Sequence, residues 1–283
     1  MITESMPTIG ALVSATTQQT TLDEDALQAW DRDGYHIARG LFGPDEVAAI
    51  RDRFDRVAER GEPIPGHWEP RPEGADILAR YPRVMHPHDY DPDSKTVLLD
   101  PRVHRILVQL MGDEVLACQT MYYFKPPGAR GQAFHQDNYY LLVQPYTCIA
   151  AWLAVDRSWP ENGGLMVTPG THRGELECPE SADPSQSFTD DYVAPPTQPV
   201  GLDLAPGDML FFTGSVIHGS GPNRTTDSWR RSFISHYLPA QATHIGGWYL
   251  PHMYDFDGNP VTRESTAWGG PCGEDSPKFR GFH

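Results

Sequence analysis

Apolar residues recur at helical spacing in three segments within the first 113 residues. In the longest, Val47, Ile50, Phe54 and Val57 follow one another at intervals of 3, 4 and 3, as they would along one face of a helix. An aspartate or proline typical of helix starts precedes each segment, and a glycine typical of helix ends follows it. With these caps included, the predicted helices run over residues 23–34, 44–61 and 100–112.

From about residue 114 the pattern changes to short runs rich in β-branched and aromatic residues, separated by Gly, Pro, Asn and Asp. Alternation of apolar and polar residues is clearest over residues 231–237. This texture is typical of an antiparallel barrel or sandwich. A polar, acidic loop over residues 171–200 is long enough to act as a lid. The predicted strands are 35–39, 115–124, 139–143, 148–155, 164–167, 209–213 and 232–238.

The pattern as a whole predicts a mainly β protein with flanking helices, built as one domain behind a flexible tail. The Gly and Pro content, 26 and 27 of 283 residues, favours many turns over a helical bundle. Aromatic residues continue to the end of the chain, so we expect its last segment to pack back on the domain. The expected parts are a tail over 1–20 and a domain over 21–283, with a helical elaboration at 21–113, a β core at about 114–240 and a C-terminal segment at 241–283.

The charge balance narrows the class of partner. With 22 Lys and Arg against 38 Asp and Glu, the formal net charge is −16, which repels nucleic acid and anionic membranes. No apolar run approaches the roughly 18 residues that cross a bilayer. We therefore expect a small-molecule partner. The acidic balance is first interpreted as a means of solubility, and it would also attract a cationic substrate such as a polyamine or an aminosugar; charge alone does not decide between the two.

Four widely spaced cysteines bear on the compartment. Cys118 and Cys148 lie in predicted strands and should be small buried apolar residues. Without a CxxC pair, we expect no disulfide framework. The first residues lack the charged start and apolar stretch of a secretory signal. Free thiols then predict a cytoplasmic protein.

The candidate chemistry centres on His135-Gln136-Asp137 and on His218, which follows 81 residues after the aspartate. Two imidazoles and one carboxylate on one face of a metal leave three coordination positions open, as in non-haem Fe(II) oxygenases. In an extended segment His135 and Asp137 would point to the same face. The small residues 219–221 leave room beside His218.

Two neighbouring arginines, Arg230 and Arg231, lie 12 and 13 residues after His218. A guanidinium can bind the distal carboxylate of a 2-oxoglutarate co-substrate with two parallel hydrogen bonds. On a strand the two arginines point to opposite faces, and Ser232 shares the face of Arg230. We therefore predict that Arg230 and Ser232 form the anchor and that Arg231 faces solvent.

Other histidines compete less well as metal ligands. The stretches 67–69 and 86–89 contain closely spaced His, Glu and Asp, but they lie in the Pro-rich region 62–92 with no strand to fix them. We interpret them as surface or pocket-lining residues. His236 alternates with Ile234 on a predicted strand and is interpreted as a core histidine.

The order of these motifs resembles the phytanoyl-CoA dioxygenase family of Fe(II)/2-oxoglutarate oxygenases, over roughly Trp30 to Pro239. The segments that carry the resemblance are Asp33-Gly34-Tyr35, Lys125-Pro126-Pro127-Gly128, His135-Gln136-Asp137, Trp152 to Asp156, Glu161-Asn162-Gly163-Gly164, Pro169 to His172, Pro206 to Phe212 and His218 to Asn223.

The resemblance implies a double-stranded β-helix (jelly-roll, cupin-like) core and a dioxygenase that uses Fe(II), 2-oxoglutarate and O2. It makes His135, Asp137 and His218 the iron ligands. It also makes Arg230 the co-substrate anchor, with three further residues that touch the co-substrate or line its pocket: Gln119, Trp152 and Ser232.

Two features separate the chain from other members. The sequence shows no peroxisomal targeting segment and no basic patch for coenzyme A phosphates, which argues against an acyl-CoA substrate. Related halogenases replace the metal-binding carboxylate, whereas Asp137 is present, so hydroxylation-type chemistry is predicted.

The favoured substrate is an aminoglycoside, oxidised in the manner of kanamycin B dioxygenase, by hydroxylation or by oxidative deamination to a ketone. A terpenoid or polyketide hydroxylase is the alternative within the class. Two hypotheses that place the protein in another functional class stay open: a non-catalytic jelly-roll binding protein with a structural metal, and a cupin-like metal hydrolase or isomerase. A homo-oligomer is compatible with all of them.

Overall fold

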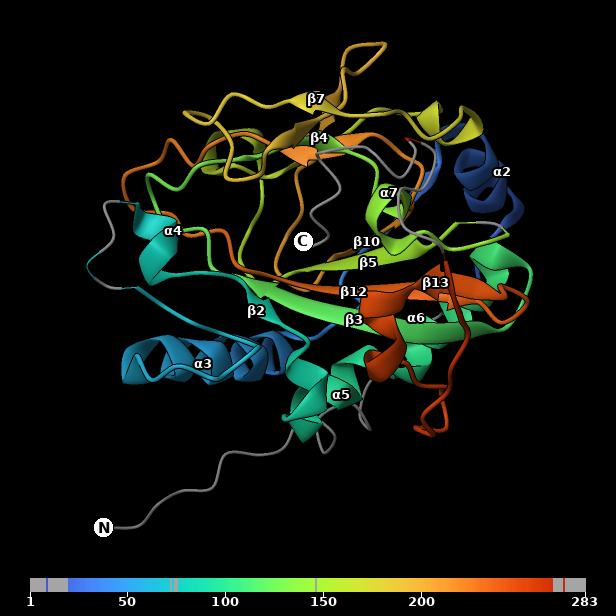
Figure 1. The fold of residues 1–283 in the computed structure, drawn as a ribbon, viewed down its shortest axis with the longest axis horizontal. Helices are drawn as coiled ribbons and strands as arrows, with labels where there is room; N and C mark the ends of the chain where they lie inside the picture. The colour runs from blue at the N-terminus through green and yellow to red at the C-terminus, as the bar shows by residue number, and fades with distance from the viewer. Residues whose placement is uncertain are drawn as a thin grey trace.

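Two antiparallel sheets face each other at the centre of the molecule, as the computed structural model shows (Figure 1). One sheet has six strands and the other has four. The structure describes residues 20–266 except 72, 74, 75 and 146, together with residues 9 and 272. Apart from residues 9 and 20, the predicted tail over residues 1–20 lies outside the described residues.

The six-stranded sheet supplies the floor of the interior. Its three middle strands are buried on both faces because helices cover one side and the second sheet covers the other, which explains their nearly continuous apolar runs. The first and last strands in the sheet come from the part predicted to be a helical elaboration. In spatial order the strands are β1 (Tyr35–Ala38), β10 (Met209–Thr213), β5 (Ile149–Ala154), β12 (Ser232–Pro239), β3 (Val115–Tyr123) and β2 (Val84–Met85).

The four-stranded sheet forms the roof, and Figure 1 shows β4 above the larger sheet. Together the two sheets make the predicted jelly-roll core, so that the fold class is confirmed. The roof strands are β4 (Gln132–His135), β11 (His218–Ser220), β6 (Leu165–Val167) and β9 (Val200–Gly201). Two short pairs lie outside it: β7 (Glu180–Ser181) with β8 (Asp191–Tyr192), and β13 (His244–Gly246) with β14 (Glu264–Thr266).

The three predicted helices are confirmed as α2 (Glu24–Asp33), α3 (Pro44–Arg60) and α6 (Pro101–Met111). Asp23 accepts a hydrogen bond from the backbone N–H of Ala26 (2.8 Å), and a left-handed glycine follows each helix. The region 62–92, predicted to be irregular, is partly ordered into short elements that run just beyond it. These are α4 (Ile77–Arg80), β2, the 3-10 helix η1 (Pro87–Asp89) and α5 (Pro92–Leu98).

The helices α3, α5 and α6 pack below the larger sheet (Figure 1) and bury its outer face. The ring of Phe54 from α3 stacks on Tyr122 of β3 with 3.9 Å between the ring centroids. A separate apolar cluster fills the space between the sheets. The interior face of β3, β5 and β12 is thus held by packing on both sides, which fixes the side chains that point into the barrel.

A β-bulge interrupts the pairing of β3 with β12. His236 pairs with Gln119, whereas Tyr237 pairs with Ala117, so Cys118 is the extra residue. On one side of the bulge Gln119 and Met121 share the inward face, and on the other Ala117 packs against the helices. The bulge therefore changes which alternate residues of β3 face the interior.

The prediction of a strand over residues 139–143 is wrong, because residues 139–141 lie in a short helix, α7 (Asn138–Leu141). The side-chain oxygen of Asn138 accepts from the N–H of Val143 (3.1 Å), and Leu142 adopts a left-handed conformation that ends the helix. Most of this run is buried. A short apolar run does not reveal its period, so sequence cannot separate strand from helix here.

The cysteines behave as predicted only in part. Cys118 and Cys148 are free and buried, as expected. Cys178 and Cys272, in contrast, form a disulfide that was not predicted. The two residues are 94 positions apart. Only the fold brings the 171–200 loop beside the end of the chain.

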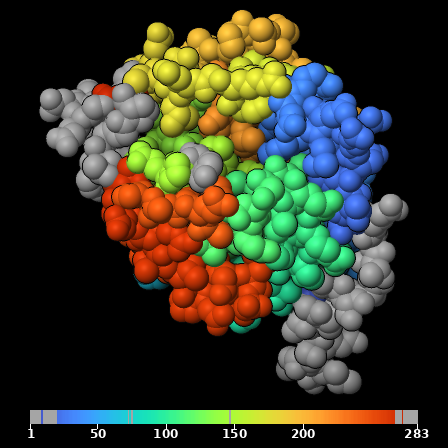
Figure 2. All heavy atoms as spheres, turned by 90° about the vertical axis from the view of Figure 1, so that its right-hand side faces the viewer, coloured from blue at the N-terminus to red at the C-terminus, as the bar shows by residue number. Residues whose placement is uncertain are grey.

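The described part of the C-terminal segment, residues 241–266, packs partly on the helical side of the molecule. Tyr254 exchanges backbone hydrogen bonds with Ala117, and the ring of Phe256 stacks on His104 of α6 at 4.2 Å. Figure 2 shows this segment, in red, beside the green helical region. No helix among the described residues is long and apolar enough to cross a membrane. The remaining 3-10 helices are η2 (Pro160–Asn162), η3 (Thr171–Arg173) and η4 (Gly247–His252).

Candidate active site

Two adjacent roof strands bring the candidate histidines together. His135 ends β4 and His218 begins β11, and the two residues lie directly opposite each other in the antiparallel pair. Their ring centroids are 4.2 Å apart. Gly219 permits this approach, because a Cβ there would meet the backbone of Phe134 at 3.0 Å. Two histidines that are 83 residues apart in sequence thus form a single cross-strand pair.

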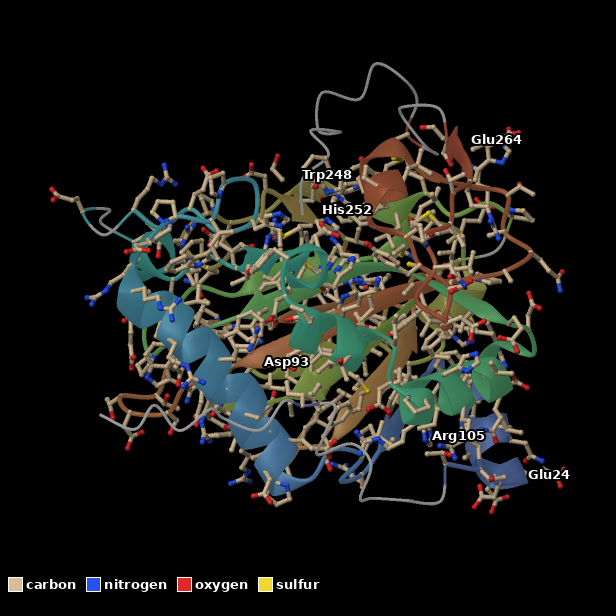
Figure 3. All side chains as sticks on the ribbon, turned by 90° about the horizontal axis from the view of Figure 1, so that it is seen from below. Glu24, Asp93, Arg105, Trp248, His252 and Glu264 are labelled. Carbon is tan, nitrogen blue, oxygen red and sulfur yellow. A yellow bond between two sulfur atoms is a disulfide. The ribbon has the colours of Figure 1, made fainter. Side chains whose placement is uncertain are left out.

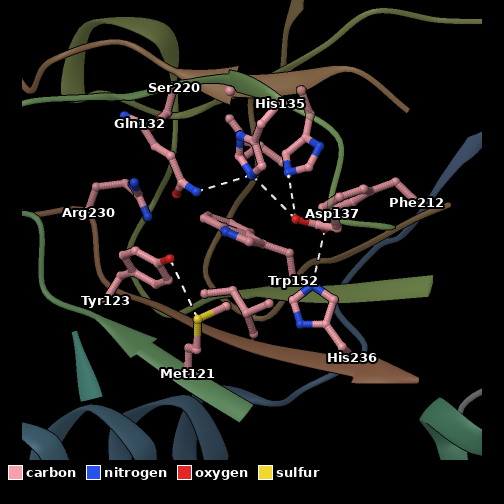
Figure 4. A pocket seen from close by; sticks show the side chains of 14 residues that line it. Met121, Tyr123, Gln132, His135, Asp137, Trp152, Phe212, Ser220, Arg230 and His236 are labelled. Carbon is pink, nitrogen blue, oxygen red and sulfur yellow. Dashed lines mark hydrogen bonds and ion pairs between the residues drawn. The ribbon is translucent and has the colours of Figure 1, made fainter. Parts of the chain in front are cut away.

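Asp137 completes the group from the start of α7. It has helical rather than extended backbone angles, so the expectation that both residues of the His-x-Asp motif lie on one strand is wrong. Its Oδ1 is nevertheless 3.3 Å from His135 Nε2 and 3.5 Å from His218 Nε2 (Figure 4). Burial alone would raise the pKa of the Asp137 carboxyl, but His218, His236 and His135 outweigh it and hold the pKa well below its usual value.

Hydrogen bonds on the far side of each ring set the histidine tautomers. His135 Nδ1 bonds the carbonyl of Ala133 (2.8 Å) and His218 Nδ1 bonds that of Val216 (3.0 Å). Each Nδ1 must therefore carry the proton, which leaves a lone pair on each Nε2. Burial lowers the pKa of His218 to about 4, so this ring is neutral near pH 7.

The ligand atoms of His135, Asp137 and His218 fit a transition metal. They all lie within 4.8 Å of one another, and all three residues are buried. Two neutral imidazoles and an ionised carboxylate are the donor set that Fe(II) takes in oxygenases, with the remaining positions open to the pocket. The Gln132 side-chain amide approaches the same His135 Nε2 (3.1 Å) and has to turn away when this nitrogen binds a metal.

His236 was interpreted as a core histidine, and the structure gives it a more specific place. Its Nε2 bonds Asp137 Oδ2 at 3.1 Å, and it lines the pocket (Figure 4). One carboxylate oxygen is thus held by His236 while the other faces the two ligand nitrogens. The sequence signal was its alternation on β12, which puts it on the same face as Arg230.

Gln136 links this group to the long loop. Its side-chain N–H donates to the carbonyl of Ser215 (2.8 Å), and its Oε1 accepts from the backbone N–H of Glu177 (2.8 Å). The middle residue of the His-x-Asp motif therefore points away from the pocket and ties the 171–200 loop to the strand that carries His135.

Arg230 lies at the opposite end of the pocket and is only 4% exposed. Its guanidinium donates to Ser232 Oγ (2.9 Å) and to the carbonyl of Gly163 (3.2 Å), and it lies over the ring of Trp152. Burial lowers its pKa to about 10, which still leaves it charged at neutral pH. The predicted pairing of Arg230 with Ser232 is present, although Ser232 is not among the residues that line the pocket.

Lys125 is a second buried basic residue, which the sequence analysis named only as part of the Lys125-Pro126-Pro127-Gly128 motif. Its Nζ donates to Ser220 Oγ (2.8 Å) and to the carbonyl of Gly221 (2.7 Å). Burial and the neighbouring Arg230 lower its pKa well below the usual value. A Cβ on Gly163 would overlap the Lys125 side chain, so the glycine makes room for it. Among the described residues neither Arg230 nor Lys125 has a carboxylate partner, so the charged guanidinium of Arg230 is available to an incoming anion.

Basic residues also gather where the sequence showed no basic patch. A cavity of about 380 Å³ adjoins the pocket and shares Tyr123 and Arg230 with it. The single acidic residue in its lining, Asp76, is bound by Arg130. The basic residues of the lining are Arg71, Arg83, Lys125, Arg130 and Arg230. They come from separate parts of the chain, which is why they were not recognised as one group.

The other predicted residues have different surroundings. Trp152 lines the pocket, whereas Gln119 is buried outside the pocket lining and its Nε2 has no hydrogen-bond partner. Arg231 does not face solvent as predicted. It bonds Asp156 (2.7 Å) and Asp55 on the helical side of the sheet, and its side chain is 16% exposed. The two arginines directly precede β12 and do point to opposite sides of the sheet.

The chain matches the family model described as "Phytanoyl-CoA dioxygenase (PhyH)" over residues 30–232. It is 25% identical over 258 residues to the peroxisomal phytanoyl-CoA dioxygenase of Rattus norvegicus, covering 80% of this chain and 73% of the relative. It is 27% identical over 228 residues to the methylphosphonate hydroxylase of Gimesia maris, covering 78% and 83%.

A solved structure with the same fold is that of SnoK, a non-haem α-ketoglutarate-dependent carbocyclase from nogalamycin biosynthesis. It superposes with a TM-score of 0.65 at 20% identity, covering 81% of this chain and 89% of SnoK. The family match spans well over half of the chain and includes every candidate ligand, Arg230 and Ser232. The chain belongs to the phytanoyl-CoA dioxygenase family, and it is an Fe(II)- and 2-oxoglutarate-dependent dioxygenase.

Proposed function

We propose that this dioxygenase oxidises an unactivated C–H bond of a small-molecule natural product, with His135, Asp137 and His218 as the iron ligands. The observation that carries the assignment is the convergence of two imidazole Nε2 atoms and one carboxylate oxygen on a pocket that also contains a buried, unpaired arginine. When bound, iron with 2-oxoglutarate and O2 supplies the oxidising power, and succinate and CO2 are the co-products.

The residues of the chain supply binding and orientation. Arg230, supported by Ser232 and Gly163, holds the distal carboxylate of 2-oxoglutarate. Trp152 braces the guanidinium. The basic cavity beside Arg230 attracts the doubly charged co-substrate from solvent.

The substrate class rests on the lining of the pocket. Asp137 is its one carboxylate, and we propose that this group serves the metal, so the described lining offers no acidic group to a cationic substrate. The remaining lining is largely apolar, through Met121, Leu165, Phe212 and Ile234. These features favour the terpenoid or polyketide alternative over the predicted aminoglycoside. SnoK, a relative in fold, acts in nogalamycin biosynthesis.

A structural metal site or a metal hydrolase is less well supported. A structural site closes its coordination with four protein ligands, whereas three converge here. Neither alternative has a use for a buried arginine without a counter-ion. The predicted cytoplasmic location and the predicted homo-oligomer remain predictions, and the Cys178–Cys272 disulfide is of a kind that reducing compartments disfavour.

Anaerobic reconstitution with Fe(II) tests the assignment. Addition of 2-oxoglutarate should produce a weak visible charge-transfer band that is absent in His135→Ala and weakened in Arg230→Ala. Succinate release is then measured with neutral polyketides or terpenoids and, in parallel, with aminoglycosides. Iron binding without any response to 2-oxoglutarate would overturn the proposal, and succinate release stimulated only by aminoglycosides would restore the original substrate prediction.

A further inference from the structure

A second group of metal-ligating side chains lies outside the pocket, on the segment that follows β2. His86 and Asp89 come from this segment and His252 from the end of η4. One donor atom from each lies within 4.8 Å of the other two. Figure 3 shows His252 beside Trp248 on the surface of the C-terminal segment.

His86 is the unusual member of this group. It is 1% exposed, and neither of its ring nitrogens has a hydrogen-bond partner in the structure. Buried polar atoms are almost always paired, so two unpaired nitrogens on one buried ring call for an additional ligand. Its backbone is left-handed (φ 47°, ψ 46°), a conformation that a non-glycine residue keeps only when its surroundings impose it.

Neighbouring contacts hold the group in place. The His86 N–H donates to the carbonyl of Thr120 on β3 (2.8 Å), and Asp89 Oδ2 bonds His252 Nδ1 (2.7 Å). His88, the remaining histidine of the motif, is fully used: its ring nitrogens bond Thr120 Oγ1 (2.6 Å) and the carbonyl of His252 (3.0 Å). The two segments are therefore joined by hydrogen bonds around the unpaired ring of His86.

We propose that His86, Asp89 and His252 form a second metal-binding site, for a transition-metal dication of the Zn²⁺ type. Two imidazoles and one carboxylate suit this class of ion. Burial and the adjacent His252 lower the pKa of His86 to about 2, so its ring is neutral, the form that binds metal. The rings of His86 and His252 stack at 3.6 Å, and sharing an ion requires the more exposed His252 to turn out of the stack.

The site joins the segment after β2 to the C-terminal segment, so its occupancy stabilises the packing of the two against each other. It does not depend on the function proposed for the pocket, because none of its residues lines that pocket.

The test uses the full-length chain, free of any affinity tag, with the candidate iron ligands removed by His135→Ala, Asp137→Ala and His218→Ala. Zn²⁺ titration of this background should give one bound ion per chain and a higher unfolding temperature, and Co²⁺ should give visible d–d absorption. His86→Phe and His252→Gln should each weaken binding at least 100-fold. The matched control is His104→Ala, since His104 also pairs with a carboxylate (Glu114, 2.9 Å) and stacks on a ring.

Absence of Zn²⁺ binding by the background would overturn the proposal, as would binding that survives both His86→Phe and His252→Gln. If His86→Phe does not fold, Asp89→Asn, which changes a more exposed residue, takes its place in the comparison.

Discussion

Two groups of side chains in this molecule have the same composition, two histidines and one aspartate, but their nitrogen atoms are held differently. In the pocket, His135 and His218 are each fixed by a backbone carbonyl on Nδ1, so both present Nε2 to Asp137. In the second group, His86 has no hydrogen bond on either nitrogen and its ring stacks on that of His252.

The difference concerns how much reorganisation a metal requires. In the pocket the tautomers and ring directions are already set, and the Gln132 amide has to move away from His135. At the second site a ring has to rotate. We therefore expect the pocket to bind its metal more tightly and to lose more when a ligand is removed.

The largest effect is expected from His135→Ala. Loss of a residue that merely supports a metal ligand costs about 10–100-fold in affinity or activity, so loss of a ligand should lower succinate formation by more than about 100-fold. The charge-transfer band with Fe(II) and 2-oxoglutarate should disappear with it. Near-parental turnover in this variant would show that His135 is not a ligand.

Arg230→Ala should raise the dissociation constant for 2-oxoglutarate roughly 100-fold, because hydrogen bonds to a charged group contribute about 1.5–3 kcal/mol each. Equilibrium titration of the Fe(II) enzyme measures it. Arg231→Ala is the matched control: its loss removes bonds to Asp55 and Asp156 and should lower the free energy of unfolding instead. Equal loss of 2-oxoglutarate affinity in both variants would contradict the anchor assignment.

Acid should destabilise the metal-free protein through its buried neutral histidines, which include His86 and its neighbour His88 as well as His218 in the pocket. Burial lowers the pKa of His86 to about 2 and of His88 to about 4, against about 6.5 in the unfolded chain. The unfolded chain therefore takes up protons first, and stability falls as pH drops below 6.5, until the pH passes each folded-state pKa. At pH 5 each histidine should cost about 2 kcal/mol.

Urea unfolding at pH 7 and pH 5 checks this expectation. His86→Phe should reduce the difference in the free energy of unfolding between the two pH values. A free energy of unfolding that does not change between pH 7 and pH 5 would contradict it.

The smallest effect is expected from His236→Phe, which removes the hydrogen bond to Asp137 Oδ2 but leaves all three metal ligands in place. Iron affinity should fall about 10-fold, and the dissociation constant for 2-oxoglutarate, measured at saturating iron, should stay the same. His236→Gln restores an N–H donor and should recover much of the iron affinity. If glutamine fares no better than phenylalanine, packing rather than the hydrogen bond is what His236 provides.

Local signals in the sequence predicted what local physics decides. Asp23 caps the start of α2 and Gly34 caps its end, and both could be predicted because capping depends only on neighbouring residues. The His-x-Asp motif and His218 were recognised by residue type and order, and the two strands then placed them opposite each other.

Features that depend on contacts distant in sequence were not predicted. The disulfide, the carboxylate partners of Arg231 and the basic cavity each combine segments that no spacing rule connects. The prediction of a strand over residues 139–143 was wrong for a different reason: this segment is apolar and mostly buried, so the spacing of its apolar residues does not distinguish a strand from a helix.

The bulge at Cys118 has a consequence for how the gene can change. In strand β3 the odd-numbered residues face the barrel after the bulge and face the helices before it. Substitution of Cys118 by another small apolar residue preserves both orientations. Deletion of its codon would remove the bulge, so that either the residues around Met121 or Ala117 and Val115 would turn to the opposite face of the sheet. A gene of this kind should therefore tolerate replacements at this position far more readily than a one-codon loss.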